Sequence, residues 1–151
     1  MKPREAFYFD HAKGAANPCP PYSSGEAGLV WINRDDEPET DRRVEILPNS
    51  FHALYGHGVV VRLNELDLVG GPIGAGRDAV VAPAAVEDAA RIFYDADRMT
   101  YGAQHDLRIG RREGVEYRLA VDNREYQRTL SKLQFLSTTA SRSGYGLRLR
   151  L

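Results

Sequence analysis

The clearest alternation of apolar and polar positions lies in the last third of the chain. Residues 115–121 alternate apolar with mostly polar side chains, which predicts a half-buried strand. Across the turn GRREG this strand is expected to form a hairpin with residues 105–110. The chain closes on LRLRL, residues 147–151, a predicted strand with its leucines inward and its arginines outward.

Shorter or weaker strand patterns precede this region. Residues 29–33 form a β-branched and aromatic run, and residues 44–47 form a second short strand with Val44 and Ile46 on one face. Residues 59–69 predict a longer strand, and DAVVAP at 78–83 a short extended piece. The first third is otherwise rich in Gly, Pro, Ser and Asn and is expected to be mostly loop.

Helical periodicity predicts three helices. Pro83 begins one that runs to about Asp97, with its apolar stripe at i, i+3, i+4 and i+7. Asp122 and Glu125 resemble a capping box, so a second helix starts there and ends at Gly144. A short helix after Asn49 or Ser50 completes the set.

These elements predict one α+β domain spanning residues 1–151. We expect a mainly antiparallel sheet of about six short strands, with two moderate helices and one short helix packed on it.

Composition agrees with a single globular domain of 151 residues that are 42% hydrophobic and 27% charged. No apolar run approaches the roughly 18 residues of a membrane span, and no apolar signal-like run follows the N-terminus. We therefore expect a cytoplasmic protein with no membrane partner. Cys19 is the only cysteine, so an internal disulfide is excluded. Arginine supplies all but three of the 20 basic residues, which is typical of a GC-rich bacterial genome.

The segment GPIGAGRD, residues 71–78, has the glycine spacing of a phosphate-binding loop. However, Arg77 replaces the motif's lysine, and Asp78 stands where the hydroxyl residue should be. Pro83 also delays the following helix by several residues. We interpret the segment as a connecting loop whose glycines adopt positive φ, and we expect no cofactor.

The histidines form no metal-ligand pattern, so no metal site is expected. We also expect no catalytic residue. The alternative is a small hydrolase or transferase in which His57 or His105 acts as general base and arginines bind an anionic substrate.

Two charged surfaces could bind a partner. The first is a predicted acidic loop, for which a solvated turn is the plainer interpretation: Asp35, Asp36, Glu37, Glu39 and Asp41. The second is a predicted arginine face, formed if the last strand pairs beside the hairpin, for an acidic protein or a nucleic acid: Arg108, Arg111, Arg112, Arg118, Arg148 and Arg150.

With no coherent catalytic constellation, the sequence favours a small protein-binding, inhibitory protein. Its most specific form is an immunity protein that neutralises a bacterial toxin, with the acidic loop docking on a basic toxin domain. The enzyme is the second hypothesis and a nucleic-acid-binding module is the third. The sequence leaves the oligomeric state open.

Overall fold

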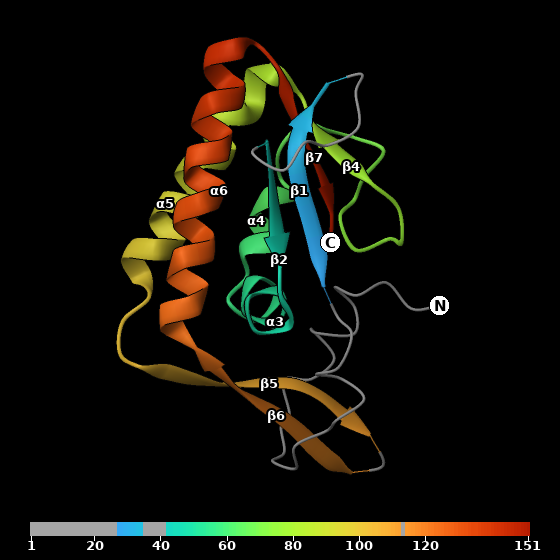
Figure 1. The fold of residues 1–151 in the computed structure, drawn as a ribbon. Helices are drawn as coiled ribbons and strands as arrows, with labels where there is room; N and C mark the ends of the chain where they lie inside the picture. The colour runs from blue at the N-terminus through green and yellow to red at the C-terminus, as the bar shows by residue number, and fades with distance from the viewer. Residues whose placement is uncertain (1–26, 35–41, 113) are drawn as a thin grey trace.

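The computed structural model describes residues 27–34, 42–112 and 114–151, with the backbone alone at 108–112, 115–117 and 119. Within these residues the chain forms seven strands, four α-helices and one 3-10 turn (Figure 1). They are β1 (Gly28–Asn33), β2 (Arg43–Ile46), α3 (Pro48–Gly56), α4 (Val59–Leu63), β3 (Leu68–Val69), β4 (Ala79–Val81), η2 (Pro83–Ala85), α5 (Val86–Met99), β5 (Gln104–Arg112), β6 (Val115–Asp122), α6 (Asn123–Ser143) and β7 (Gly146–Arg150).

Five strands make one antiparallel sheet in the order β2-β1-β7-β4-β3. The predicted alternation in β7 is confirmed, because Leu147 and Leu149 are buried while Arg148 and Arg150 are not. The strands predicted at 29–33 and 44–47 are present as β1 and β2, and Val44 and Ile46 are both in the core, as expected of one face. The expected α+β fold with a mainly antiparallel sheet is therefore correct.

The helices cover one face of this sheet. Helices α5 and α6 pack against each other, and α6 also contacts β1, β2 and β7 (Figure 1). Phe93 of α5 and Tyr126 and Leu130 of α6 are among the fully buried side chains between the layers. In the described part of the chain, no helix has both the length and the apolar character needed to cross a membrane.

The remaining strands, β5 and β6, pair only with each other in the described residues. This antiparallel ribbon projects from the end of the body where α5 ends and α6 begins (Figure 1). The predicted hairpin is confirmed, although its turn is tighter than expected, since the strands extend to Arg112 and resume at Val115.

The single strand predicted over residues 59–69 is wrong. Residues 59–63 form helix α4, and only Leu68–Val69 is extended. Gly58, at φ 81°, turns the chain just before Val59. Val59, Val60 and Leu63 are then buried, a spacing that lies on one side of a helix. Packing against α3 and α5 thus overrides the β-propensity of the valines.

Asn49 does not cap α3 as expected. The N-cap position is Leu47, which provides no side-chain bond. Instead, the Asn49 side chain exchanges two hydrogen bonds with the backbone of Asp122. Its Nδ2 donates to the Asp122 carbonyl over 3.0 Å, and the Asp122 amide donates to its Oδ1 over 2.7 Å. Asn49 therefore joins α3 to the start of α6.

The predicted cap of the long helix is confirmed. The carboxylate of Asp122 accepts hydrogen bonds from the amides of Arg124 and Glu125 over 2.9 and 3.3 Å. At the other end, Gly144 adopts a left-handed conformation with φ 77° and ends α6.

We predict that Asp122→Ala lowers the free energy of unfolding by about 0.5–2 kcal/mol, because two amides of the first turn lose their acceptor. Urea denaturation measures this loss. Asp122→Asn keeps an acceptor oxygen and should retain most of the stability. Equal midpoints for wild type and Asp122→Ala would mean that the cap contributes nothing.

Candidate functional site

The two histidines singled out from the sequence come together in the structure. His57 follows α3, and its amide donates to the carbonyl of Ala53 over 2.9 Å. His105 is the second residue of β5, where the ribbon leaves the body. Their ring centres lie 4.8 Å apart in an edge-to-face arrangement. Residues separated by 48 positions thus meet at the base of the ribbon.

A cavity of about 170 Å³ adjoins the two rings. Its wall is mostly apolar, and Arg62 of α4 and Tyr126 of α6 contribute polar groups. Tyr126 stacks on His57 with ring centres 5.3 Å apart. Arg62 forms an ion pair with Asp95 at 3.3 Å, so its charge is already matched.

Burial favours the neutral form of His57. Desolvation first, and then the neighbouring His105, lower the pKa of His57 below its ordinary value. Burial first, and then the negative charge of Asp97, raise the pKa of Tyr126. His57 Nε2 and the Tyr126 hydroxyl are both buried without a hydrogen-bond partner in the described part of the chain.

The orientation of His105 is set by Asn123, the first residue of α6. Asn123 Nδ2 lies within hydrogen-bonding distance of the carbonyls of Tyr101 and Gly102, at 3.0 and 3.4 Å. His105 Nδ1 lies 3.1 Å from Oδ1 and 2.9 Å from Nδ2 of Asn123, so this amide holds the ring through Nδ1.

The two histidines can accept a proton, but the cavity lacks the carboxylate that usually assists a catalytic histidine. No carboxylate lines the cavity. Among the described residues, no cluster of three or more His, Cys, Asp or Glu side chains is placed to hold a metal ion. The histidines thus form a compact, mostly apolar site in which His105 is oriented by an amide.

The structure does not assemble the predicted arginine face. Strand β7 pairs with β1 and β4, not with the hairpin, so Arg148 and Arg150 lie on a different sheet from Arg118. The backbone at 108, 111 and 112 belongs to β5, and the side chains there lie outside the described residues. Two segments with alternating apolar and polar residues need not pair with each other in a sheet. The alternation therefore did not show that β7 lies beside the hairpin.

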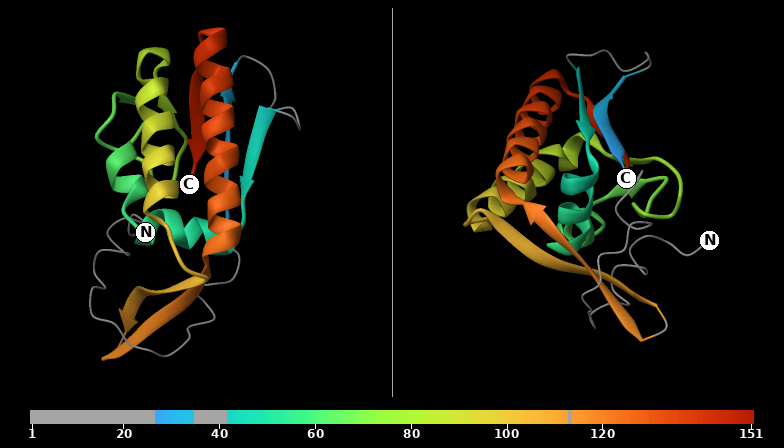
Figure 2. Two further views of the ribbon diagram at one scale, coloured as in Figure 1. Left: turned by 90° about the vertical axis from the view of Figure 1, so that its left-hand side faces the viewer. Right: turned by 60° about the horizontal axis from the view of Figure 1, so that its bottom comes forward.

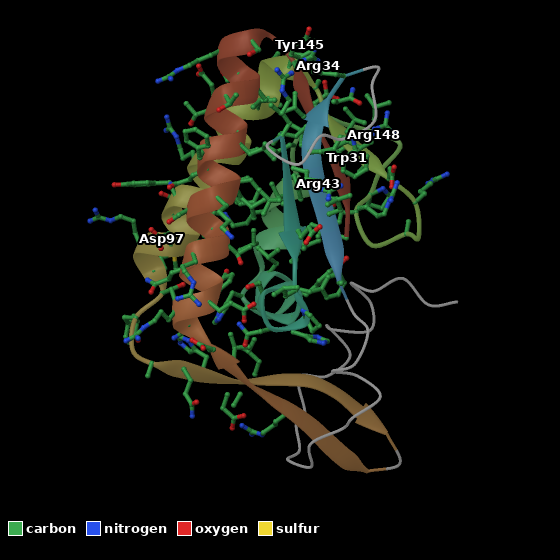
Figure 3. All side chains as sticks on the ribbon, viewed as in Figure 1. Trp31, Arg34, Arg43, Asp97, Tyr145 and Arg148 are labelled. Carbon is green, nitrogen blue, oxygen red and sulfur yellow. The ribbon has the colours of Figure 1, made fainter. Side chains whose placement is uncertain are left out.

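Arg148 and Arg150 have structural partners on the sheet face away from the helices. In the strand register, Trp31 pairs with Arg43 on one side and Arg148 on the other (Figure 3). The Arg150 guanidinium lies 5.0 Å from the centre of the Trp31 ring. Asp78 accepts from Arg150 over 3.0 Å and lies 3.6 Å from Arg148. These two arginines therefore share the carboxylate of Asp78.

Asp78 is the last residue of the glycine-rich segment, which the structure shows to be a connecting loop. The segment connects β3 to β4, which pair with each other, so a strand follows it where a phosphate loop would have a helix. Gly74 and Gly76 have positive φ, as expected of a connecting loop. Arg150, first of all, and then Arg148 hold the pKa of Asp78 below its ordinary value despite partial burial.

The predicted acidic loop, Asp35, Asp36, Glu37, Glu39 and Asp41, lies outside the described residues. Its role in binding stays a prediction.

A surface that the sequence analysis missed lies on the outer side of the helix layer. No other described element covers α5 and α6 there (Figure 2). Phe135 of α6 is 73% exposed and Tyr94 of α5 is 48% exposed, and both line a groove between the two helices. Met99 and Tyr101, at the end of α5 and just after it, are exposed too. The signal was readable, because Phe135 is an aromatic residue that lies off the helical row formed by Tyr126, Leu130 and Leu133.

Comparisons with known proteins give no relative. No family model matches the chain, and neither a curated protein nor a solved structure matches it.

We predict that His57 makes the protein less stable in mild acid. Since the folded pKa of His57 is below its ordinary 6.5, the unfolded chain binds this proton first as the pH falls. The contribution is complete above about pH 6.5 and is lost as the pH falls through the lowered folded value. Urea melts between pH 4.5 and 8, roughly spanning this titration, should show the decline.

The His57→Gln variant should flatten that decline, and His105→Gln should reduce it less, because His105 is the smaller cause. His52 is also buried, but it is unchanged in both variants, so it does not account for a difference between them. An unchanged pH profile in His57→Gln would show that another group is responsible.

Proposed function

We propose that this chain is a small protein-binding protein of the inhibitory kind, and that it binds its partner through the outer face of α5 and α6. The supporting observation is where exposed apolar residues gather. Of seven large apolar side chains exposed in the described residues, Tyr94 and Phe135 line the groove on this face, and Met99 and Tyr101 lie at the end of α5 and just after it.

The residue types on this face are those that contribute most to binding between proteins. Aromatic residues, methionine and arginine are enriched in interfaces, whereas scattered polar residues contribute little. Tyr94 and Phe135 stand on opposite walls of the α5–α6 groove, where Ala90 leaves room between them. A partner side chain inserted there would lose water on both sides, which is the setting of a binding hot spot.

Inhibition is the specific form of this proposal, and immunity to a toxin is its narrowest form. A stable two-layer domain can block a partner's site sterically without any chemistry of its own. The acidic loop lies outside the described residues, and its docking on a basic region of the partner stays a separate prediction.

Site-specific photo-crosslinking identifies the partner. A crosslinking amino acid at position 135 should give a discrete protein adduct in cells of the source organism. The same amino acid at Val69, which is 63% exposed on edge strand β3, should not. Identical adducts from both positions would mean that position 135 makes only nonspecific contacts.

With the purified partner, Phe135→Ser should weaken binding at least tenfold, which corresponds to about 1.4 kcal/mol. Val69→Ser is the matched control, because Val69 is 63% exposed but lies on edge strand β3. The partner's activity should fall on addition of one equivalent of wild-type protein. The same amount of the Phe135→Ser variant should inhibit that activity less. Equal binding by both variants would contradict the proposal.

The second candidate function is a small enzyme, favoured by the meeting of His57 and His105 beside one cavity that Arg62 also lines. Here Arg62 would have to exchange its ion pair with Asp95 for the anionic substrate. Gln substitutions at both histidines separate the two functions. The binder keeps its partner affinity in these variants, whereas the enzyme loses turnover and keeps any partner.

A further inference from the structure

The outer side of α6 carries a row of three cations. Arg124, Arg128 and Lys132 are exposed and follow one another at four-residue intervals. Four residues advance an α-helix by about 6 Å and turn it by about 40°, so the three charges form a row inclined to the helix axis. Phe135 lies three residues beyond Lys132 and is exposed as well. We call Arg124, Arg128 and Lys132 the basic row.

The fold gives no reason for these charges. Like charges four residues apart destabilise a helix, and the basic row contains two such pairs. Arg124 also lies in the first turn, where the helix dipole disfavours a cation. By contrast, Arg142 lies in the last turn, where the dipole favours it, so Arg142 is not counted in the row.

The basic row is also electrostatically unmatched. Elsewhere in the described chain Arg62, Arg118 and Arg148 are paired with aspartates. Within the described residues, no side-chain ion pair or hydrogen bond involves Arg124, Arg128 or Lys132. Positive charges that repel one another and have no internal partner suit an anionic partner.

We propose that the basic row, together with the α5–α6 groove, binds an acidic amphipathic helix of the partner protein. This inference rests on the proposed function and names the chemistry of its partner. A helix laid along α6 repeats its side chains with the same 6 Å rise, so carboxylates four residues apart meet the cations in register. Apolar side chains on the adjoining face of that helix enter the groove beside Phe135 and Tyr94.

A nucleic acid fits this face less well. The groove next to the row contains Ala90, Tyr94 and Phe135, which can contact apolar side chains, together with polar residues that include Asp95. Glu87 and Asp88 are exposed at the start of α5 and would repel a polyanion that continued along the layer. A short acidic helix ends before it reaches them.

The test uses a synthetic amphipathic peptide with glutamate at every fourth position and leucine on the adjoining face. Fluorescence anisotropy with the full-length chain should show binding that weakens with salt. Arg128→Glu should weaken it at least tenfold. Arg77→Glu is the matched control, since Arg77 is exposed on the loop between β3 and β4, and it should change binding less than twofold.

Charge exchange makes the test specific. A variant with both Arg128→Glu and Lys132→Glu should lose the glutamate peptide and gain affinity for the same peptide carrying lysines. Arg128→Gln with Lys132→Gln serves if the reversed pair folds poorly, and it should bind neither peptide well. Circular dichroism confirms the fold of each variant.

Three results would overturn the inference. They are no binding of the glutamate peptide by wild type, equal binding by wild type and Arg128→Glu, or a DNA duplex that binds as tightly with the same dependence on Arg128. If Phe135→Ser weakens binding of the crosslinked partner while reversal of the row does not, the proposed function stands and only the acidic helix is wrong.

Discussion

The rest of the structure depends on the pairing of the last strand, β7, at the centre of the sheet. It bonds to β1 on one edge and to β4 on the other, so it joins the two halves of the sheet. Leu147 and Leu149 are buried within the core on its inner side. At Gly146 the backbone of β7 lies so close to the Val81 carbonyl that a side chain there would collide with it. Residues 146–150 are therefore the central strand on which the sheet depends.

This constraint also explains helix α6. The helix must carry the chain from the base of the ribbon back to the far end of the sheet so that β7 can enter it (Figure 1). Its inner face, with Tyr126, Leu130 and Leu133, is fixed by packing against the sheet and α5. Nothing in the described chain packs on its outer face, so the residues there are free of the demands of the core. Exposed Phe135 and the basic row occupy that free face.

Much of this fold was predictable because its signals are local. Alternation identified β6 and β7, a β-branched and aromatic run identified β1, and the Asp122 cap and Gly144 fixed both ends of α6. Helix α4 was missed because its burial at Val59, Val60 and Leu63 depends on the turn at Gly58 and on neighbours distant in sequence. The arginine face failed for a similar reason, since strand order depends on long-range pairing.

The candidate sites show the same difference between local signals and long-range contacts. The sequence identified His57 and His105 as separate candidates, but only the fold brings their ring centres to 4.8 Å from each other. The i, i+4, i+8 spacing of the basic row was present in the sequence, yet its lack of partners required the structure.

The central claim is that the fold does not use the outer face of α6. The most direct test neutralises the basic row with Arg124→Gln, Arg128→Gln and Lys132→Gln in one chain and measures its free energy of unfolding in urea at low salt. Removing two like-charge pairs should leave stability unchanged or raise it by up to about 1 kcal/mol. A loss of more than about 1 kcal/mol would show that these cations stabilise the fold, and would contradict the account.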